Sequence, residues 1–248
     1  MNTAIVWFRR DLRLHNNPAL NWACGHCDAI LPVFIHSPEE DSPWQPGGAS
    51  RWWLDKSLRA LEADLKNYGL TLQCYTGNSS KILGDLINTS KAQSVVFNRL
   101  YEPHLHHRDE SLIKTLNKLS VDVRGFDTGL FFKPGIILNN QNLPYRVYTP
   151  FSKRIRSKLH EIDTNFSSNI QKLKSIKTVH PDKSGYIDDL NLNDHFNWYA
   201  KLEHYWQPGE QQALLRIHEF LEHILCDYDS QRDIPSVDGT SALSAHLH

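Results

Sequence analysis

The fold of this chain is decided by its first strand-like stretch, Thr3-Ala-Ile-Val-Trp7-Phe8-Arg9-Arg10. The stretch is apolar until it meets two arginines, which is typical of a buried strand that ends at the surface. Charged side chains at such a strand end either line the crevice where α/β proteins bind ligands or form a structural ion-pair network. Both interpretations stay open for the segment from Trp7 to Leu20.

Strand and helix patterns alternate from this stretch to residue 126. Four more strands are predicted, at Ala29 to Ile35, Leu70 to Tyr75, Val95 to Phe97 and Val121 to Phe126. Helices are predicted between them, at Pro18 to Cys24, Ala49 to Tyr68, Lys81 to Asn88 and His104 to Leu119. Strands separated by helices of this length imply right-handed crossovers. The pattern therefore predicts an α/β domain with a Rossmann-like, five-stranded parallel sheet that is covered on both faces.

The longest predicted helix has one apolar face. Its members recur at steps of three and four residues: Trp53, Leu54, Leu58, Leu61 and Leu65. The adjacent Trp52 and Trp53 point about 100° apart on a helix, so at least one of them is expected in the core. No Gly-x-Gly-x-x-Gly follows the first strand, which argues against a dinucleotide site of the dehydrogenase type.

The composition limits the partners and the compartment. The chain has 248 residues, 40% of them apolar, and a formal net charge of −1. This balance gives no global electrostatic footprint for nucleic acid, so a DNA-binding surface would have to be local. The sequence shows neither a basic leader nor an apolar run of membrane-spanning length, and we expect a cytoplasmic monomer.

Two cysteines, Cys24 and Cys27, lie at redox-motif spacing with His26 between them. A zinc site would need two further ligands, and Cys74 and Cys226 are isolated. We therefore interpret the pair as small residues at a helix end and a strand start. No metal site is predicted, and the same holds for His106-His107, because adjacent helical side chains diverge.

Residues 127 to 200 have a different character. Pro and Gly interrupt them repeatedly, and polar residues dominate beyond residue 163, which predicts a long connection with one amphipathic helix near Phe151 to His160. A further helix begins after Gly209, and its apolar face comprises Ala213, Leu214, Ile217, Phe220, Leu221 and Ile224. We divide the chain into an α/β domain (residues 1–130), a linker (131–200) and the start of an all-α domain (201–248).

The last motif is Tyr228-Asp-Ser-Gln-Arg232-Asp-Ile-Pro-Ser-Val-Asp-Gly239-Thr-Ser-Ala-Leu-Ser244. Thr240 or Ser241 suits the N-cap of a following helix, and a helix start with free N–H groups and hydroxyls can receive a phosphate. A plain N-cap is the alternative. The sequence ends where this helix should begin, so we expect an amino-terminal fragment of a longer protein.

Several motifs resemble the DNA photolyase and cryptochrome family. The terminal motif matches the family's Tyr-x-x-x-Arg-Asp-x-Pro-x-x-x-Gly-Thr-Ser-x-Leu-Ser, and the segment from Trp7 to Leu20 is similar to its amino-terminal signature. Three further segments, which begin at Trp44, Asn98 and Pro144, are similar to other family segments in the same order.

The resemblance implies light-dependent repair of cyclobutane pyrimidine dimers in DNA, by electron transfer from reduced flavin adenine dinucleotide (FAD). It implies a deoxyribodipyrimidine photo-lyase whose catalytic residues lie outside this chain, so the fragment itself is expected to be inactive. It implies FAD contacts by Tyr228 and by Thr240, Ser241, Ala242, Leu243 and Ser244, and a DNA-phosphate contact by Arg232. On the residues alone, Tyr228 could instead be core and Arg232 could pair with Asp233.

The antenna chromophore is less defined. Folate-binding members carry Asn-Glu where this chain has His104-Leu105, so methenyltetrahydrofolate is expected from prevalence, with a deazaflavin, a flavin or an empty pocket as alternatives. The resemblance also leaves open a cryptochrome-type photoreceptor, or a non-enzymatic nucleotide-binding α/β module.

Overall fold

The structure is a computed structural model that describes residues 1–162, 170–181, 183–193 and 198–247. Its strands are β1 (Thr3–Phe8), β2 (Ala29–His36), β3 (Gln73–Thr76), β4 (Ser94–Asn98), β5 (Asp122–Phe126) and β6 (Lys177–Thr178). Its α-helices are α1 (Pro18–His26), α2 (Gly48–Lys66), α3 (Ser79–Ser90), α4 (Pro103–Leu116), α5 (Tyr148–Lys158), α6 (Ile170–Leu173), α7 (Ala200–Tyr205), α8 (Glu210–Glu219), α9 (Tyr228–Gln231) and α10 (Ser244–Leu247). Short 3-10 turns lie at 117–119, 159–161, 187–190 and 225–227, and a π-helical turn lies at Phe220–Ile224.

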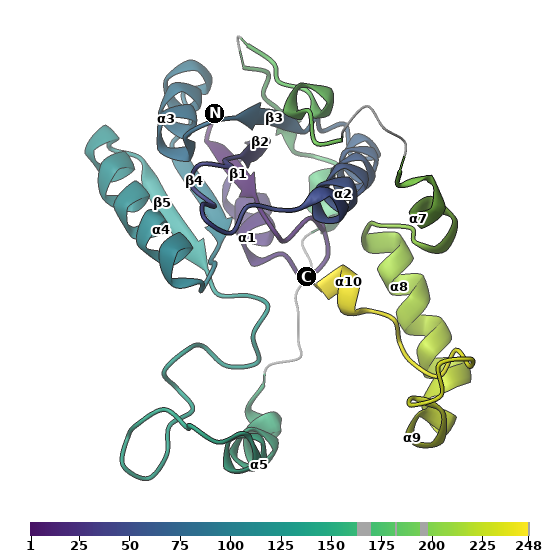
Figure 1. Cartoon of the computed structure of the whole chain (residues 1–248). Helices are drawn as coiled ribbons and strands as arrows, with labels where there is room; N and C mark the ends of the chain where they lie inside the picture. The colour runs from purple at the N-terminus through teal and green to yellow at the C-terminus, as the bar shows by residue number, and fades with distance from the viewer. Residues whose placement is uncertain (163–169, 182, 194–197, 248) are drawn as a thin grey trace.

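The predicted parallel sheet is confirmed. Its strand order is β3-β2-β1-β4-β5, every pairing is parallel, and β1 lies at the centre. In Figure 1, α3 and α4 lie on one side of the sheet and α1 and α2 on the other. Both faces are covered, and this accounts for the uninterrupted burial of β1.

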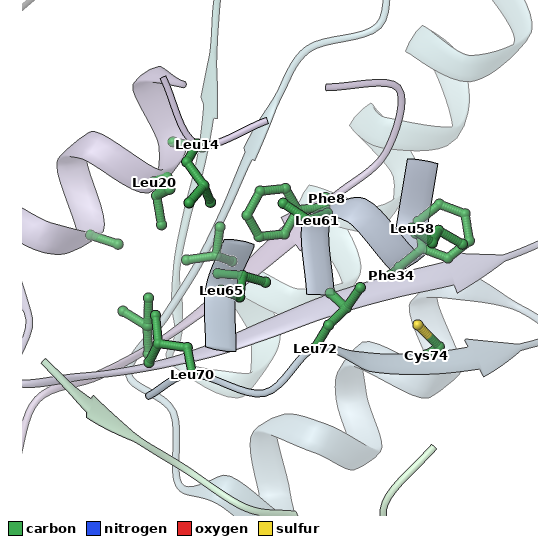
Figure 2. Close-up of a cluster of buried hydrophobic side chains, with 14 of the residues drawn as sticks. Phe8, Leu14, Leu20, Phe34, Leu58, Leu61, Leu65, Leu70, Leu72 and Cys74 are labelled. Atoms are coloured by element: carbon green, nitrogen blue, oxygen red, sulfur yellow. The ribbon is translucent and has the colours of Figure 1, made fainter. Parts of the chain in front are cut away.

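Side chains of β1 alternate between two cores. Ala4, Val6 and Phe8 pack with α1 and α2, whereas Ile5 and Trp7 pack with α3 and α4. Figure 2 shows the first core, in which helix α2 directs three leucines toward the strands: Leu58, Leu61 and Leu65. The leucines of the predicted apolar face therefore cover the sheet, whereas Trp53 of that face contacts Trp206 and His246 instead.

The third strand is shorter than the prediction, which began it at Leu70. Helix α2 ends at Lys66, Gly69 takes a left-handed φ of 74°, and the Leu70 amide bonds the Leu65 carbonyl at 3.1 Å. This is a Schellman-type helix end, in which the residue after the glycine packs back on the helix. Leu70 is consequently buried as part of the cap and not of the strand.

The linker contributes to the α/β domain, which the sequence did not predict. Its strand β6 pairs with the start of β2, and Gly185 bonds Cys74 backbone to backbone at 3.1 Å. A Cβ on Gly185 would lie 2.0 Å from the Cys74 carbonyl oxygen, so only glycine fits there. Four linker side chains complete the first core: Leu173, Ile187, Leu190 and Leu192. Residues 163–169, 182 and 194–197 of the predicted linker lie outside the described residues.

The predicted helices of the second half are present. The amphipathic helix expected near Phe151 to His160 is α5, and the helix expected after Gly209 is α8. Within the described residues, no helix combines the length and apolar character that a membrane crossing requires.

Candidate functional site

The predicted cofactor residues lie at the end of the helical segment, which comprises residues 200–247 from α7 to α10. Tyr228 begins α9, Arg232 is the C-cap residue after it, and the loop 233–243 leads to α10, which begins at Ser244. The yellow segment in Figure 1 returns along α8 toward the α/β domain. The predicted N-cap residues, Thr240 and Ser241, stand before this short helix, and the Ser241 hydroxyl accepts a long bond of 3.5 Å from the Leu243 amide. The expected helix start is therefore displaced by about one turn.

Arg216 of α8 organises this loop. Its guanidinium donates to the Thr240 carbonyl at 2.9 Å and to the Ser241 carbonyl at 3.0 Å. It also pairs with Asp238 at 2.6 Å and with Glu219 at 2.8 Å, and the hydrogen bond that it donates to Asp238 is the main cause of its raised pKa. A planar guanidinium with several fixed donors suits such a multiple contact. Sequence reasoning missed Arg216, because an arginine within an amphipathic helix gives no signal of a distant loop.

The held loop leaves backbone donors free. The carbonyls of Thr240 and Ser241 face Arg216, whereas no acceptor in the described part of the chain bonds the amides of Thr240, Ser241 and Ala242. Ala242 has a left-handed φ of 51°, a conformation found where successive amides form an anion-binding concavity. The loop can therefore offer several N–H groups to one anionic group.

Gly239 joins the two ends of the motif. A Cβ at this position would lie 2.7 Å from the carbonyl carbon, the carbonyl oxygen and the Cβ of Gln231. The loop can pass this close to the end of α9 only because residue 239 has no side chain. The glycine at position 239 of the motif thus has a steric cause.

Tyr228 and Arg232 contact each other. The Arg232 guanidinium lies 5.6 Å from the centre of the Tyr228 ring, and its Nε lies 3.6 Å from an oxygen of Asp233. A hydrogen bond with Tyr228 is the main cause of the raised pKa of Arg232. Tyr228 is half-buried and packs edge-on against Phe220 at 5.9 Å. Each of these residues therefore has a structural contact, while Arg232 remains exposed to solvent.

The loop after β1 anchors the helical segment. The carboxylate of Glu210, at the start of α8, accepts hydrogen bonds from the Leu14 and His15 amides at 2.8 and 2.9 Å. Gly209, with a φ of 119°, lies so close to α2 that a Cβ would be 2.7 Å from Ala60. The amino-terminal signature and the start of the helical segment are thus in contact. Sequence reasoning did not identify Glu210, because nothing local connects it to a loop almost 200 residues earlier.

An aromatic cluster forms a second contact between the two parts. Trp53 of α2 lies 5.9 Å from Trp206 and 5.1 Å from His246, and both rings meet it edge-on. Trp52 is 2% exposed, so the expectation that at least one tryptophan of the pair is core is confirmed. His246 belongs to α10, so Trp53 helps to place the helix that follows the predicted cofactor loop.

The charged residues after β1 form a structural network. Arg9 and Asp109 make a buried ion pair at 2.7 Å, and burial is the main reason that the pKa of Arg9 is lowered. Asp11 accepts from the Arg9 amide at 2.8 Å and from Asn17, and Asn98 donates to Asp11 and Asn17. These groups are engaged with one another, so the structure favours the ion-pair network over a ligand crevice.

The segments that begin at Trp44 and Asn98, whose family resemblance implies a place beside the antenna chromophore, lie in the α/β domain. Trp44 is 79% exposed, and Tyr101 donates to Asp127 at 2.7 Å. Burial and this carboxylate raise the pKa of Tyr101 to about 12. His104 is exposed on α4, whereas Leu105 is buried beneath it. In the described residues, no three potential ligands among His, Cys, Asp and Glu converge on one point.

A hollow of about 460 Å³ lies elsewhere, at the amino end of β2, with Cys24 and Cys27 in its wall. Both thiols are free, and burial raises the pKa of Cys24 to about 12. A protonated, buried thiol is a poor nucleophile and a poor metal ligand. This supports the interpretation of the pair as packing residues at a helix end and a strand start.

Comparison with known proteins agrees with this architecture. The DNA photolyase family model matches residues 4–170. A deoxyribodipyrimidine photo-lyase from Agrobacterium fabrum is 35% identical over 98% of this chain and 50% of its own length. Cryptochrome-2 of Arabidopsis thaliana is 32% identical over 98% of this chain and 40% of its own length.

A solved structure gives the same result. The class III photolyase from Agrobacterium tumefaciens superposes with a TM-score of 0.86 at 34% identity, over 99% of this chain and 50% of that one. The chain thus spans about half the length of the photo-lyases that it matches. On its sequence, its parallel sheet and this match, the chain belongs to the DNA photolyase family, in which photo-lyases and cryptochromes are related.

Proposed function

We propose that these 248 residues form the amino-terminal part of a deoxyribodipyrimidine photo-lyase, which repairs cyclobutane pyrimidine dimers in DNA under light. The observation that carries the proposal is the loop at 240–242. Arg216 holds its carbonyls while its amides remain without acceptors in the described residues. Such a loop fits the diphosphate of a flavin dinucleotide.

The residues of the motif then have separate tasks. The amides and hydroxyls from Thr240 to Ser244 bind phosphate, Tyr228 lines the cofactor site, and Arg216 orients the loop. Arg232 binds a DNA phosphate from the exposed end of α9. Reduced FAD, when bound, supplies the electron that splits the dimer, so the chain contributes binding and electrostatics.

The α/β domain is proposed to hold an antenna chromophore. The prevalence of folate in the family favours methenyltetrahydrofolate. A deazaflavin or a flavin is the alternative, because the folate-binding Asn-Glu pair is replaced by His104-Leu105. We further propose a cytoplasmic monomer that acts on duplex DNA.

A chimera tests the function. Residues 1–248 are joined to the second half of the Agrobacterium fabrum photo-lyase, and light-dependent repair of a dimer-containing oligonucleotide is measured beside FAD content. We expect FAD binding and repair by the chimera, and loss of FAD from its Arg216→Ala variant, with Arg124→Ala as the control on an exposed pair. A chimera that binds FAD and yet leaves dimers intact would favour the cryptochrome alternative.

The chain by itself is expected to release FAD during equilibrium dialysis at micromolar concentration. One loop supplies only part of a flavin site, and each missing charge-assisted bond costs about 1.5–3 kcal/mol. Stoichiometric retention by residues 1–248 would show that the site lies elsewhere in the chain.

A further inference from the structure

The charge of this chain is distributed unevenly. Residues 128–160 contain no Asp or Glu, and they contain six Lys or Arg residues, although the whole chain has a formal net charge of −1. Four of these cations lie on α5, at Lys153, Arg154, Arg156 and Lys158. The remaining residues are therefore net acidic, and the only acid-free basic segment of this length surrounds one helix.

Helix α5 presents its cations to solvent. Lys153, Arg154 and Arg156 are exposed, and none of them forms an ion pair with a described residue. Lys158 differs, because it pairs with Glu161 at 2.7 Å. Glu161 attracts Arg154 only at longer range than its ion pair with Lys158. The three neighbouring positive charges repel one another, and a polyanion relieves this repulsion.

The two sides of α5 differ in character. Phe151 and Ile155 are half-buried and share one side, and the Phe151 ring lies 6.1 Å from Tyr145 of the preceding loop. At 100° per residue, Lys153 points away from this side, with Arg154 and Arg156 to its left and right. The apolar side holds the helix to its own loop, which leaves the cationic side available.

The position of α5 agrees with a role at the DNA. Figure 1 shows α5 and α9 at the same end of the molecule in this view, with the sheet above both. Arg232 of the proposed DNA contact lies at the end of α9, but Asp229 and Asp233 flank it in sequence. A single arginine among carboxylates supplies little attraction to a polyanion at physiological salt.

We propose that Lys153, Arg154 and Arg156 of α5 form a second contact with the phosphate backbone of duplex DNA. The proposal rests on the proposed function for its choice of ligand. Duplex DNA presents negatively charged phosphates at regular spacing, and cations that neutralise these phosphates release the condensed counterions of the DNA on binding. This contact reads neither base sequence nor lesion, so it positions the protein on DNA.

The test measures binding of residues 1–248 to a short, undamaged, fluorescent duplex by anisotropy, in the dark and without flavin. In the triple variant Lys153→Gln, Arg154→Gln, Arg156→Gln, the slope of log affinity against log salt should be shallower by about 2 to 3 between 50 and 200 mM. Affinity at the low-salt end should fall by about tenfold or more.

A matched control separates a local contact from net charge. Lys91→Gln, Lys114→Gln, Lys118→Gln removes the same charge from exposed positions at the end of α3 and on or near α4. We expect this triple variant to have a slope of log affinity against log salt close to that of the unmodified chain. Lys153→Arg keeps the charge and should have the same slope as the unmodified chain. Equal effects of the two triples, or no binding by the unmodified chain at low salt, would overturn the proposal.

A membrane surface is the other polyanion to test. Phosphatidylserine vesicles are titrated with the same proteins. If the α5 triple variant loses affinity for the vesicles but not for DNA, the assignment of DNA as the ligand is overturned. Neither assay needs light, flavin or a dimer. The two proposals can therefore fail separately. If the chimera does not repair dimers but the α5 triple variant still shows the shallower salt slope, the proposed function is wrong and the phosphate contact is retained.

Discussion

The α/β domain and the helical segment that follows it bury their apolar residues to very different extents. Leu58 and Leu61 of α2 are 0% and 2% exposed, whereas Leu215 and Leu221 of the helical segment are 62% and 55% exposed. In the helical segment, among the described residues, Ile224 is the one apolar side chain of the buried core. An amphipathic helix is stable when its apolar face is covered, so the two regions depend on different sources of stability.

The difference also concerns how polar groups are used. In the α/β domain, Arg9 and Asp109 are both buried, and one Arg9 nitrogen donates to both carboxylate oxygens of Asp109. In the helical segment, Arg216 bonds the carbonyls of Thr240 and Ser241, and its carboxylate partners Glu219 and Asp238 are exposed. Water therefore competes with the second set of bonds and not with the first.

Loss of Asp109 should produce the largest effect. In Asp109→Ala, Arg9 stays buried without its carboxylate, which we expect to lower the free energy of unfolding by about 3–5 kcal/mol. Urea denaturation followed by circular dichroism measures it. Glu102→Ala is the control, since its pair with Arg10 is exposed and should contribute less than about 1 kcal/mol. Equal effects would contradict the contrast between buried and exposed pairs.

The same leucine truncation should have unequal effects in the two regions. Leu58→Ala removes a fully buried side chain and should cost about 2–5 kcal/mol, because a cavity remains in a packed core. Leu215→Ala changes a solvated side chain and should stay within about 0.5 kcal/mol. Urea denaturation of both variants is the measurement. A large effect at Leu215 would show that another surface covers α8 in solution.

The anchor between the regions gives an intermediate effect. Glu210→Ala removes two charge-assisted bonds to the Leu14 and His15 amides, and we expect a local loss of about 1.5–3 kcal/mol. Hydrogen exchange of these two amides reports it. Among the described residues, Glu222 pairs with exposed His218 and His223, so Glu222→Ala should leave the exchange of the Leu14 and His15 amides unchanged. Unchanged protection in Glu210→Ala would exclude this anchor.

The smallest effect should be a pH dependence of the aromatic contact. Burial lowers the pKa of His246, so the folded state favours its neutral ring. The contact with Trp53 is then fully present above the ordinary histidine pKa of about 6.5 and is lost as pH falls through the lowered folded value. Tryptophan fluorescence between about pH 7 and 5 follows it. His246→Phe should remove this pH dependence, and a transition retained in that variant would assign it to another group, such as His36, whose pKa burial also lowers.

Local sequence was enough for the sheet, the helices that cover it and the order of the motifs. Strand β1 and the leucines of α2 carry their periodicity within a few residues, and burial acts on that periodicity directly. The terminal motif likewise indicated a turn at Gly239 and a helix after it, although this helix begins at Ser244 and not directly after Thr240 or Ser241. Each of these signals is local, because it depends on the conformation of neighbouring residues.

Tertiary structure decided what no local pattern contains. Leu173 and Leu192 join the core from the linker without any period, because only the folded sheet offers them a surface. Arg216 bonds a loop 24 residues away, and Glu210 bonds a loop almost 200 residues away. Both contacts form because packing brings backbone groups that need a hydrogen-bond partner close to a charged side chain. The alternative between network and crevice after β1 was also decided there, since the partner of Arg9 is Asp109, 100 residues further along the chain.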